Sequence, residues 1–367
     1  MPYARMIHFG FKAVVVLVLL VGPAMAGQYE DALSAFKQGQ FETAYKLWGE
    51  LAERGDPSSQ YKLARMHHYG TGIEQNLVLA VRWYQAAASQ DHTNAQNALG
   101  WRYYKGEGVV QDYVEAIHWF SRAAFNHHAG AQNQLGWMTL HGLGIPRNTG
   151  EARKWLQDAA DQGNAEAQNN LGWIYLKGIG GLEDNGQSID WIAKAAKQGL
   201  AKAQDNLGWM YHTGTGVGKN INQTVHWYRK AALNGHVDAQ FKLGTLCYNG
   251  TEITQDLPGA LRWFEMGAQQ NLAQAQFNLG VMYFNGEGVG EDIDQAISWI
   301  EKAAQQDMAI AQYTLGMFYQ DGKVIQQDLE SARHWLNRAA LNHSPEDGFL
   351  DDLTRRIKLL LSDIQNS

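Results

Sequence analysis

The sequence repeats itself every 36 residues, and this period limits the possible folds more than any other feature. A glutamine recurs eight times at this spacing, a leucine follows each glutamine three residues later, and a tryptophan recurs in a second register. The glutamines are Gln60, Gln96, Gln132, Gln168, Gln204, Gln240, Gln276 and Gln312, and the tryptophans are Trp83, Trp119, Trp155, Trp191, Trp227, Trp263, Trp299 and Trp335. Chains with such periods form stacked units that bury their apolar sides against one another.

Each unit is expected to contain two helices joined by a glycine turn. Helix A of the second unit should end at Gly106, because glycine adopts the left-handed conformation that terminates helices without strain. Helix B should begin after an asparagine or aspartate, which cap helix N-termini well. These capping residues are Asn76, Asp112, Asn148, Asp184, Asn220, Asp256, Asp292 and Asp328. Residues at the exit of helix B, at positions 91, 127, 163, 199, 235, 271, 307 and 343, are all of types that tolerate positive φ.

The recurring pattern A-Q-x-x-L-G-x-x-Y-x-x-G-x-G-V-x-x-D-x-x-x-A-x-x-W-x-x-x-A-A resembles the Sel1-like repeat, a relative of the tetratricopeptide repeat. The resemblance implies an all-α fold, a right-handed α-solenoid of antiparallel helix pairs, with eight repeats over residues 56–343. Residues 27–55 resemble a tetratricopeptide-like hairpin that would cap the first repeat. An apolar stripe in residues 344–367, from Leu350 to Ile364, predicts a helix that caps the last repeat.

The N-terminal 26 residues have the pattern of a signal peptide. Arg5 and Lys12 precede an apolar run of about ten residues, and the small-x-small sequence Ala24-Met25-Ala26 suits signal peptidase. The run is shorter than the roughly 20 residues that span a bilayer, which favours cleavage over a permanent anchor. We therefore expect export, with the periplasm as the destination and secretion as the alternative, and no integral membrane segment after cleavage.

The repeats differ most at two positions of helix A. Four consecutive units carry Asn or Asp two residues before the leucine and Trp two residues after it: Asn97, Trp101, Asn133, Trp137, Asn169, Trp173, Asp205 and Trp209. These side chains point away from the core of their own repeat at 100° per residue. By analogy with the tetratricopeptide fold, this amide–tryptophan stripe would line a concave groove that binds a peptide. Two alternatives remain open: packing between successive A helices, and duplication without functional meaning.

Other functional classes find little support in the sequence. A net charge of −7 argues against a nucleic-acid partner. Cys247 is the single cysteine, adjacent histidines on a helix diverge by about 100°, and phosphate-binding and hydrolase motifs are missing, so we expect no metal, no cofactor and no enzyme activity. The sequence thus predicts a monomeric, non-enzymatic scaffold for a protein or peptide partner. The alternative is a glycan- or peptidoglycan-binding protein or a cell-wall enzyme, since tryptophan stripes also suit sugar rings.

Overall fold

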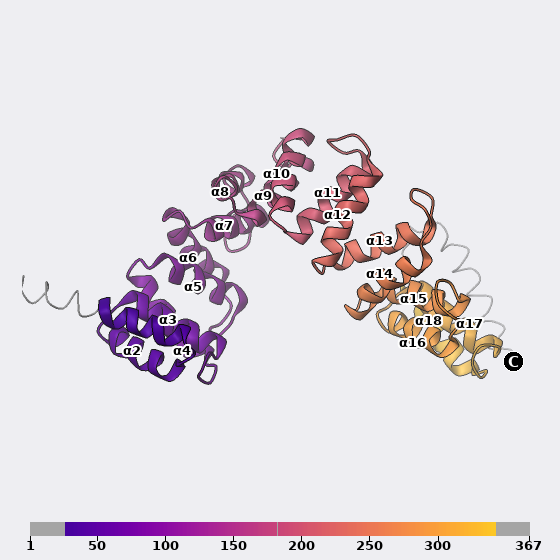
Figure 1. Ribbon diagram of the computed structural model, residues 1–367, viewed down its shortest axis with the longest axis horizontal. Coiled ribbons are helices and arrows are strands. Elements are labelled where there is room, and N and C mark those ends of the chain that lie inside the picture. The colour runs from indigo at the N-terminus through magenta and orange to yellow at the C-terminus, as the bar shows by residue number, and fades with distance from the viewer. Residues whose placement is uncertain (1–25, 182, 343–367) are drawn as a thin grey trace, which may run out of the picture. The chain divides into compact units, whose positions relative to one another are not determined.

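The computed structural model describes residues 26–181 and 183–342, and within them every regular element is a helix (Figure 1). A first helical segment spans 26–37. The helices that follow are α2 (Phe41–Glu53), α3 (Pro57–Tyr69), α4 (Leu77–Ser89), α5 (Thr93–Lys105), α6 (Tyr113–Phe125), α7 (Ala129–His141), α8 (Thr149–Asp161), α9 (Ala165–Leu176), α10 (Asn185–Lys197), α11 (Ala201–Thr213), α12 (Ile221–Leu233), α13 (Val237–Asn249), α14 (Leu257–Gln269), α15 (Ala273–Asn285), α16 (Ile293–Gln305), α17 (Ala309–Asp321) and α18 (Leu329–Asn342). Residues 1–25 of the expected signal peptide and the expected C-terminal capping helix lie outside the described residues.

The chain divides into two compact units, residues 1–183 and 184–367. In the described part of the first unit, consecutive helices from α2 to α9 contact one another in sequence order. In the second unit the same holds from α10 to α18. The odd-numbered helices from α3 to α17 are the A helices of the repeats, and the even-numbered helices from α4 to α18 are the B helices. Each unit is therefore a stack of helix pairs, as the period predicts.

The helix boundaries follow the capping residues that the sequence predicts. All eight Asn or Asp residues before the B helices accept a hydrogen bond from a backbone amide in the first turn, as Asn76 does from Leu79 at 2.9 Å. At the exit of helix B, Asp91, His127, Asn271 and Asp307 have positive φ between 57° and 66°. These local preferences explain why the period is kept without insertions.

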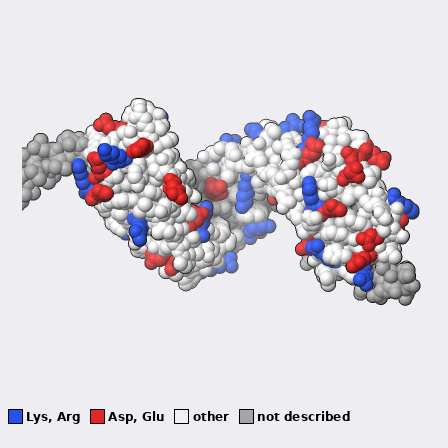
Figure 2. All heavy atoms as spheres, turned by 90° about the horizontal axis from the view of Figure 1, so that it is seen from below, with Lys and Arg blue, Asp and Glu red and all other residues white. Residues whose placement is uncertain are grey.

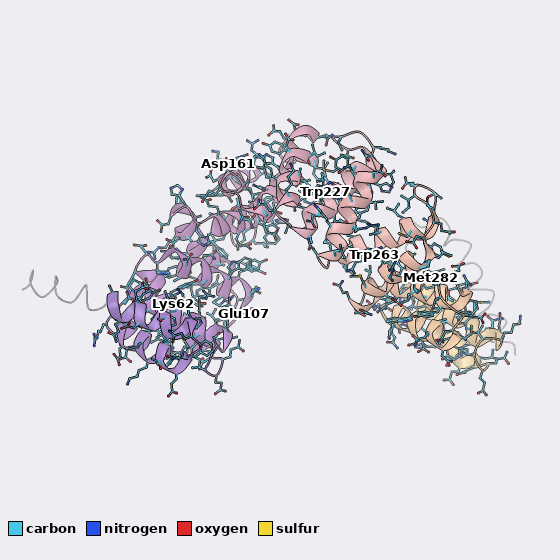
Figure 3. The ribbon with its side chains drawn as sticks, in the orientation of Figure 1. Lys62, Glu107, Asp161, Trp227, Trp263 and Met282 are labelled. Atoms are coloured by element: carbon cyan, nitrogen blue, oxygen red, sulfur yellow. The ribbon has the colours of Figure 1, made fainter. Side chains whose placement is uncertain are left out.

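A glycine in most A helices lets the B helix of the same repeat approach closely. A Cβ at Gly136 would lie 2.7 Å from Leu156 Cγ, and one at Gly208 would lie 2.5 Å from Tyr228 Cδ1. Helix B also packs on the preceding repeat: Trp263, labelled in Figure 3, packs against Ala231 and Ala232 of α12, and against Ala239 of its own repeat. Small residues thus set the spacing of the stack, because backbones can approach only where a side chain is missing.

The recurring glutamines form a buried hydrogen-bond ladder. The Nε2 of each one donates to the carbonyl of an alanine eight residues earlier, at 2.9–3.2 Å. The Oε1 of Gln132 accepts from Gln162 Nε2 at 2.6 Å, and Gln60 accepts from Gln90 in the same way. Equivalent rungs recur in the second unit, from Gln204 to Gln312. Each glutamine therefore joins its own A helix to the end of the preceding B helix, and at least seven of the eight also accept a bond from the end of their own B helix.

Candidate functional site

The amide positions of the stripe lie between neighbouring A helices within each unit. Asn133 Oδ1 accepts a hydrogen bond from Asn170 Nδ2 at 3.0 Å, and both Asp205 carboxylate oxygens contact Lys242 Nζ at 2.7–2.8 Å. Asn169 is fully buried and Asp205 is 6% exposed. Asn97 is half-buried, and its Oδ1 has no hydrogen-bond partner among the described residues. Asn133 and Asp205 thus each contact the next A helix of their unit.

All four tryptophans of the stripe are partly accessible, whereas Asn169 and Asp205 are buried. Trp101, Trp137 and Trp209 are half-buried, and Trp173 is 37% exposed. In the first unit their rings continue into other aromatic side chains. Tyr104 meets Trp101 and Trp137 edge to face, at ring-centroid distances of 5.4 and 6.3 Å, and Trp137 lies against His141 at 4.3 Å. An aromatic row thus runs along helices α5 and α7, with part of each indole open to a ligand.

A groove of about 360 Å³ opens beside Trp101, between helices α3, α4, α5 and α7. Eleven residues line it: Tyr61, Arg65, His68, Tyr69, Tyr84, Asn94, Asn97, Ala98, Trp101, Arg102 and His128. Two are arginines and four are tyrosine or tryptophan, and no carboxylate is among them. The sequence predicted only Asn97 and Trp101 as site residues. For the other lining residues, the only signal in the sequence was that the first repeat has Tyr61 and Arg65 where the four central repeats have Asn or Asp and Trp.

The two arginines of this groove are held differently. The Arg65 guanidinium lies over the rings of Tyr61 and Tyr69, 6.0 and 5.8 Å from their centroids. Arg65 is exposed, and no described carboxylate lies within ion-pair distance of it. Arg102 is 6% exposed, pairs with Glu107 at 2.8 Å and contacts the ring nitrogens of His68. The tyrosine rings thus hold the exposed guanidinium of Arg65, whereas the ion pair with Glu107 holds the buried guanidinium of Arg102.

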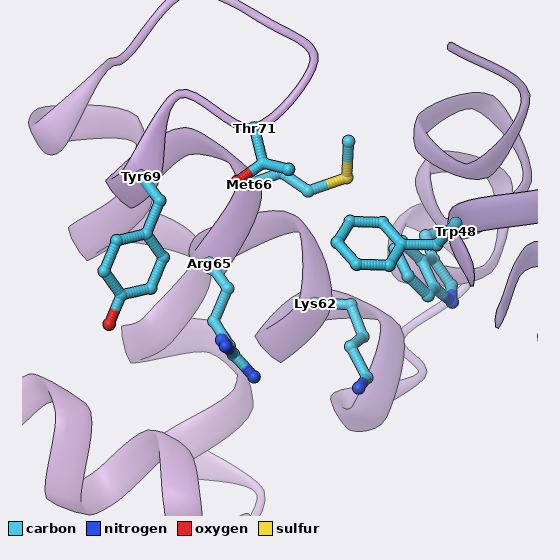
Figure 4. A pocket seen from close by; sticks show the side chains of 7 residues that line it. Trp48, Lys62, Arg65, Met66, Tyr69 and Thr71 are labelled. Atoms are coloured by element: carbon cyan, nitrogen blue, oxygen red, sulfur yellow. The ribbon is translucent and has the colours of Figure 1, made fainter. Parts of the chain in front are cut away.

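A second hollow, of about 60 Å³, shares Arg65 and Tyr69 with the groove (Figure 4). Phe36, Trp48, Met66 and Thr71 line it together with Lys62, Arg65 and Tyr69. Figure 4 shows the polar ends of Lys62, Arg65 and Tyr69 pointing to the same side of α3. Burial lowers the pKa of Lys62, and the neighbouring charges of Arg65 and Lys37 lower it further. Like charges therefore gather here without a described carboxylate between them.

Three ionisable rings of the groove, His68, His128 and Tyr84, are uncharged at neutral pH. Burial lowers the pKa of His68 and His128 below the usual histidine value, and the charge of Arg102 adds to this effect at His68. Burial raises the pKa of the Tyr84 phenol well above its ordinary value of 10.0. The arginines are therefore the main charged groups that this groove offers a ligand.

Within the described ranges, no group of three or more His, Cys, Asp or Glu side chains is placed to hold a metal ion. Cys247 is buried in the core of the second unit, and burial raises the pKa of its thiol. None of the described helices is both long and apolar enough to cross a bilayer. On the visible face, acidic and basic side chains are interspersed (Figure 2).

Comparison with known proteins identifies the repeat. The Sel1 repeat model matches eight segments, 57–92, 93–124, 129–164, 165–200, 201–236, 237–272, 273–308 and 309–344. A Sel1 repeat protein from Oxalobacter formigenes is 30% identical, with a TM-score of 0.63 over 87% of this chain and 93% of that one. A protective antigen present in uropathogenic Escherichia coli strains is 28% identical, with a TM-score of 0.56 over 93% and 84%. No curated protein matches the chain. The protein is therefore a member of the Sel1 repeat family.

Proposed function

We propose that this protein is a non-enzymatic scaffold that binds a protein or peptide partner along its A helices, and that it acts after export. Sel1 repeat proteins generally mediate protein–protein interactions, and their solenoid is typically a scaffold rather than an enzyme. The family therefore supports the class of function, and the residues of this chain support the choice of surface.

The aromatic row of the first unit is the observation that carries this choice. Trp101, Trp137 and Trp173 recur on successive A helices, and each keeps part of its indole accessible. Tryptophan contributes large contact area at low entropic cost, and it is enriched among the residues that dominate binding energy. The stripe then has two roles in our proposal: the amides join neighbouring A helices, and the indoles contact the partner.

The test compares the wild-type protein with a variant carrying Trp137→Ala and Trp173→Ala. Phe125→Ala is the matched control, because Phe125 is a large aromatic, 71% exposed, on helix α6 of the same unit. Each protein is immobilised and exposed to envelope extract, and captured proteins are identified by mass spectrometry. We expect a partner that wild type and the Phe125 variant retain and the double variant loses.

Two results would count against this function. Equal capture by all three proteins would move the partner away from the tryptophans. Saturable binding of peptidoglycan fragments, with no protein captured, would favour the glycan-binding alternative. Circular dichroism and urea unfolding of each variant separate loss of binding from loss of fold.

Export has its own test. The pattern Ala24-Met25-Ala26 supports cleavage before Gly27. N-terminal sequencing of protein recovered from the envelope or the medium should give Gly27 as the first residue, and retention of Met1 would contradict cleavage.

A further inference from the structure

We infer that the groove between helices α3 and α5 recognises an acidic, aromatic-containing peptide segment, with a carboxylate of that segment seated on Arg65. This inference rests on the proposed scaffold function, which it deepens by naming the chemistry of the partner. It also reverses a simple expectation from net charge, because a chain of charge −7 would be expected to attract a basic partner.

Both arginines, Arg65 and Arg102, occupy positions where the other repeats have uncharged residues. Arg65 stands where the four central units carry tryptophan. Arg102 stands where the neighbouring repeats have Met66 and Met138, both buried. A buried arginine in place of a core methionine costs desolvation energy that a purely structural repeat would avoid. Neighbouring repeats have thus acquired cations that line the same groove.

The positive charge of Arg65 is available to a ligand. Glu107 neutralises Arg102, but Arg65 has no described carboxylate within ion-pair distance. Lys62, which lines the neighbouring hollow, has a pKa lowered by burial and also by the charge of Arg65 (Figure 4). A carboxylate seated in the groove would form charge-assisted hydrogen bonds with this guanidinium.

The Arg65 side chain is held in place by two tyrosine rings. Tyr61 and Tyr69 hold the guanidinium from two sides, so that little side-chain entropy remains to be lost when a ligand binds. The same groove contains the half-buried ring of Trp101, which suits an aromatic side chain next to the carboxylate. A mixed acidic and aromatic segment satisfies both features, whereas a simple anion would satisfy only one.

The experiment uses the full chain and a fluorescein-labelled synthetic peptide in which Glu and Phe alternate. A second peptide has Gln in place of every Glu, which keeps size and aromatic content and removes the charge. Binding is measured by fluorescence anisotropy for wild type, Arg65→Gln and Arg102→Met. Arg147→Gln is the control, because Arg147 is an exposed arginine of the same unit outside the groove.

Wild type should bind the Glu peptide about ten-fold or more tightly than the Gln peptide, the factor expected for a charge-assisted hydrogen bond to arginine. Arg65→Gln should remove most of this preference, Arg102→Met should reduce it, and Arg147→Gln should leave it unchanged. Raising the ionic strength should weaken binding of the Glu peptide more than that of the Gln peptide.

Equal affinity for the two peptides, or a preference that survives Arg65→Gln, would overturn the inference. Tighter binding of a single-stranded oligonucleotide than of the Glu peptide would overturn it as well. These failures differ from failure of the scaffold function. A protein captured through Trp137 and Trp173 would uphold the scaffold even if the Glu peptide did not bind, whereas loss of both would refute both.

Discussion

The buried glutamine ladder gives a prediction whose size follows from its contacts. Gln132 is 2% exposed, its Nε2 donates to the Ala124 carbonyl at 3.2 Å, and its Oε1 accepts from Gln162 at 2.6 Å. Replacing it with leucine removes both bonds while keeping a side chain of similar size. The Ala124 carbonyl still accepts the His127 amide at 3.0 Å, so it is not left without a partner. We therefore expect Gln132→Leu to lower the free energy of unfolding by about 1–2 kcal/mol.

Glutamate at the same position should be worse at neutral pH. Its carboxylate would be buried and would face the Ala124 carbonyl, so that two acceptors oppose each other. An unpaired buried charge destabilises a folded protein by about 3–5 kcal/mol, so we expect Gln132→Glu to lower the free energy of unfolding by this amount. Burial raises the pKa of such a carboxyl above its unfolded value, so the folded state binds more protons. The deficit relative to wild type should then shrink as pH falls, since the protonated acid can donate to Ala124.

Urea unfolding of the full chain at several pH values measures both effects. Gln157→Leu is the control, because Gln157 lies on the surface of α8, where it bonds to Asp161. It should change the free energy of unfolding by less than about 0.5 kcal/mol. The reasoning is refuted if Gln132→Leu is as harmless as this control, or if Gln132→Glu costs no more than Gln132→Leu at neutral pH.

Three further predictions concern packing, pH and charge. Gly136→Ala should cost about 1–3 kcal/mol of unfolding free energy, because its Cβ would lie 2.7 Å from a leucine of helix α8, whereas Gly150→Ala, whose Cβ would meet Asn148 Oδ1 at an ordinary contact distance of 3.6 Å, should be neutral or stabilising. His128 caps α7 as an acceptor and burial lowers its pKa, so wild type should lose stability as pH falls below 6.5, and His128→Asn should reduce that loss in pH-dependent melts. Lys242→Met should destabilise more than Asp205→Asn in urea unfolding, because the first leaves a buried carboxylate without its cation and the second restores the amide of the other central repeats; equal effects would contradict this.

The sequence predicts which side of helix A carries the amide–tryptophan stripe, but it does not decide whether that side binds a partner or packs against the next repeat. Spacing alone placed Asn133 and Trp137 on the same side of helix A, away from the core of their own repeat. Whether a neighbouring A helix covers that side depends on the separation of successive repeats, which no single repeat contains. Asn133 contacts Asn170, 37 residues later and in the next repeat, so this contact forms only when the two repeats are stacked.

The sequence by itself determined the period, the helix pairs, their caps and the family, because these depend on interactions within a few turns of one chain segment. Glycine, asparagine and aspartate act on the backbone next to them, so their positions predict helix ends directly. Only the tertiary structure decided the role of the glutamines and the convergence of Arg65 and Arg102 on one groove. Those two arginines lie in different repeats, and a pairing across repeats is set by how the helices pack, which is a property of the assembled stack.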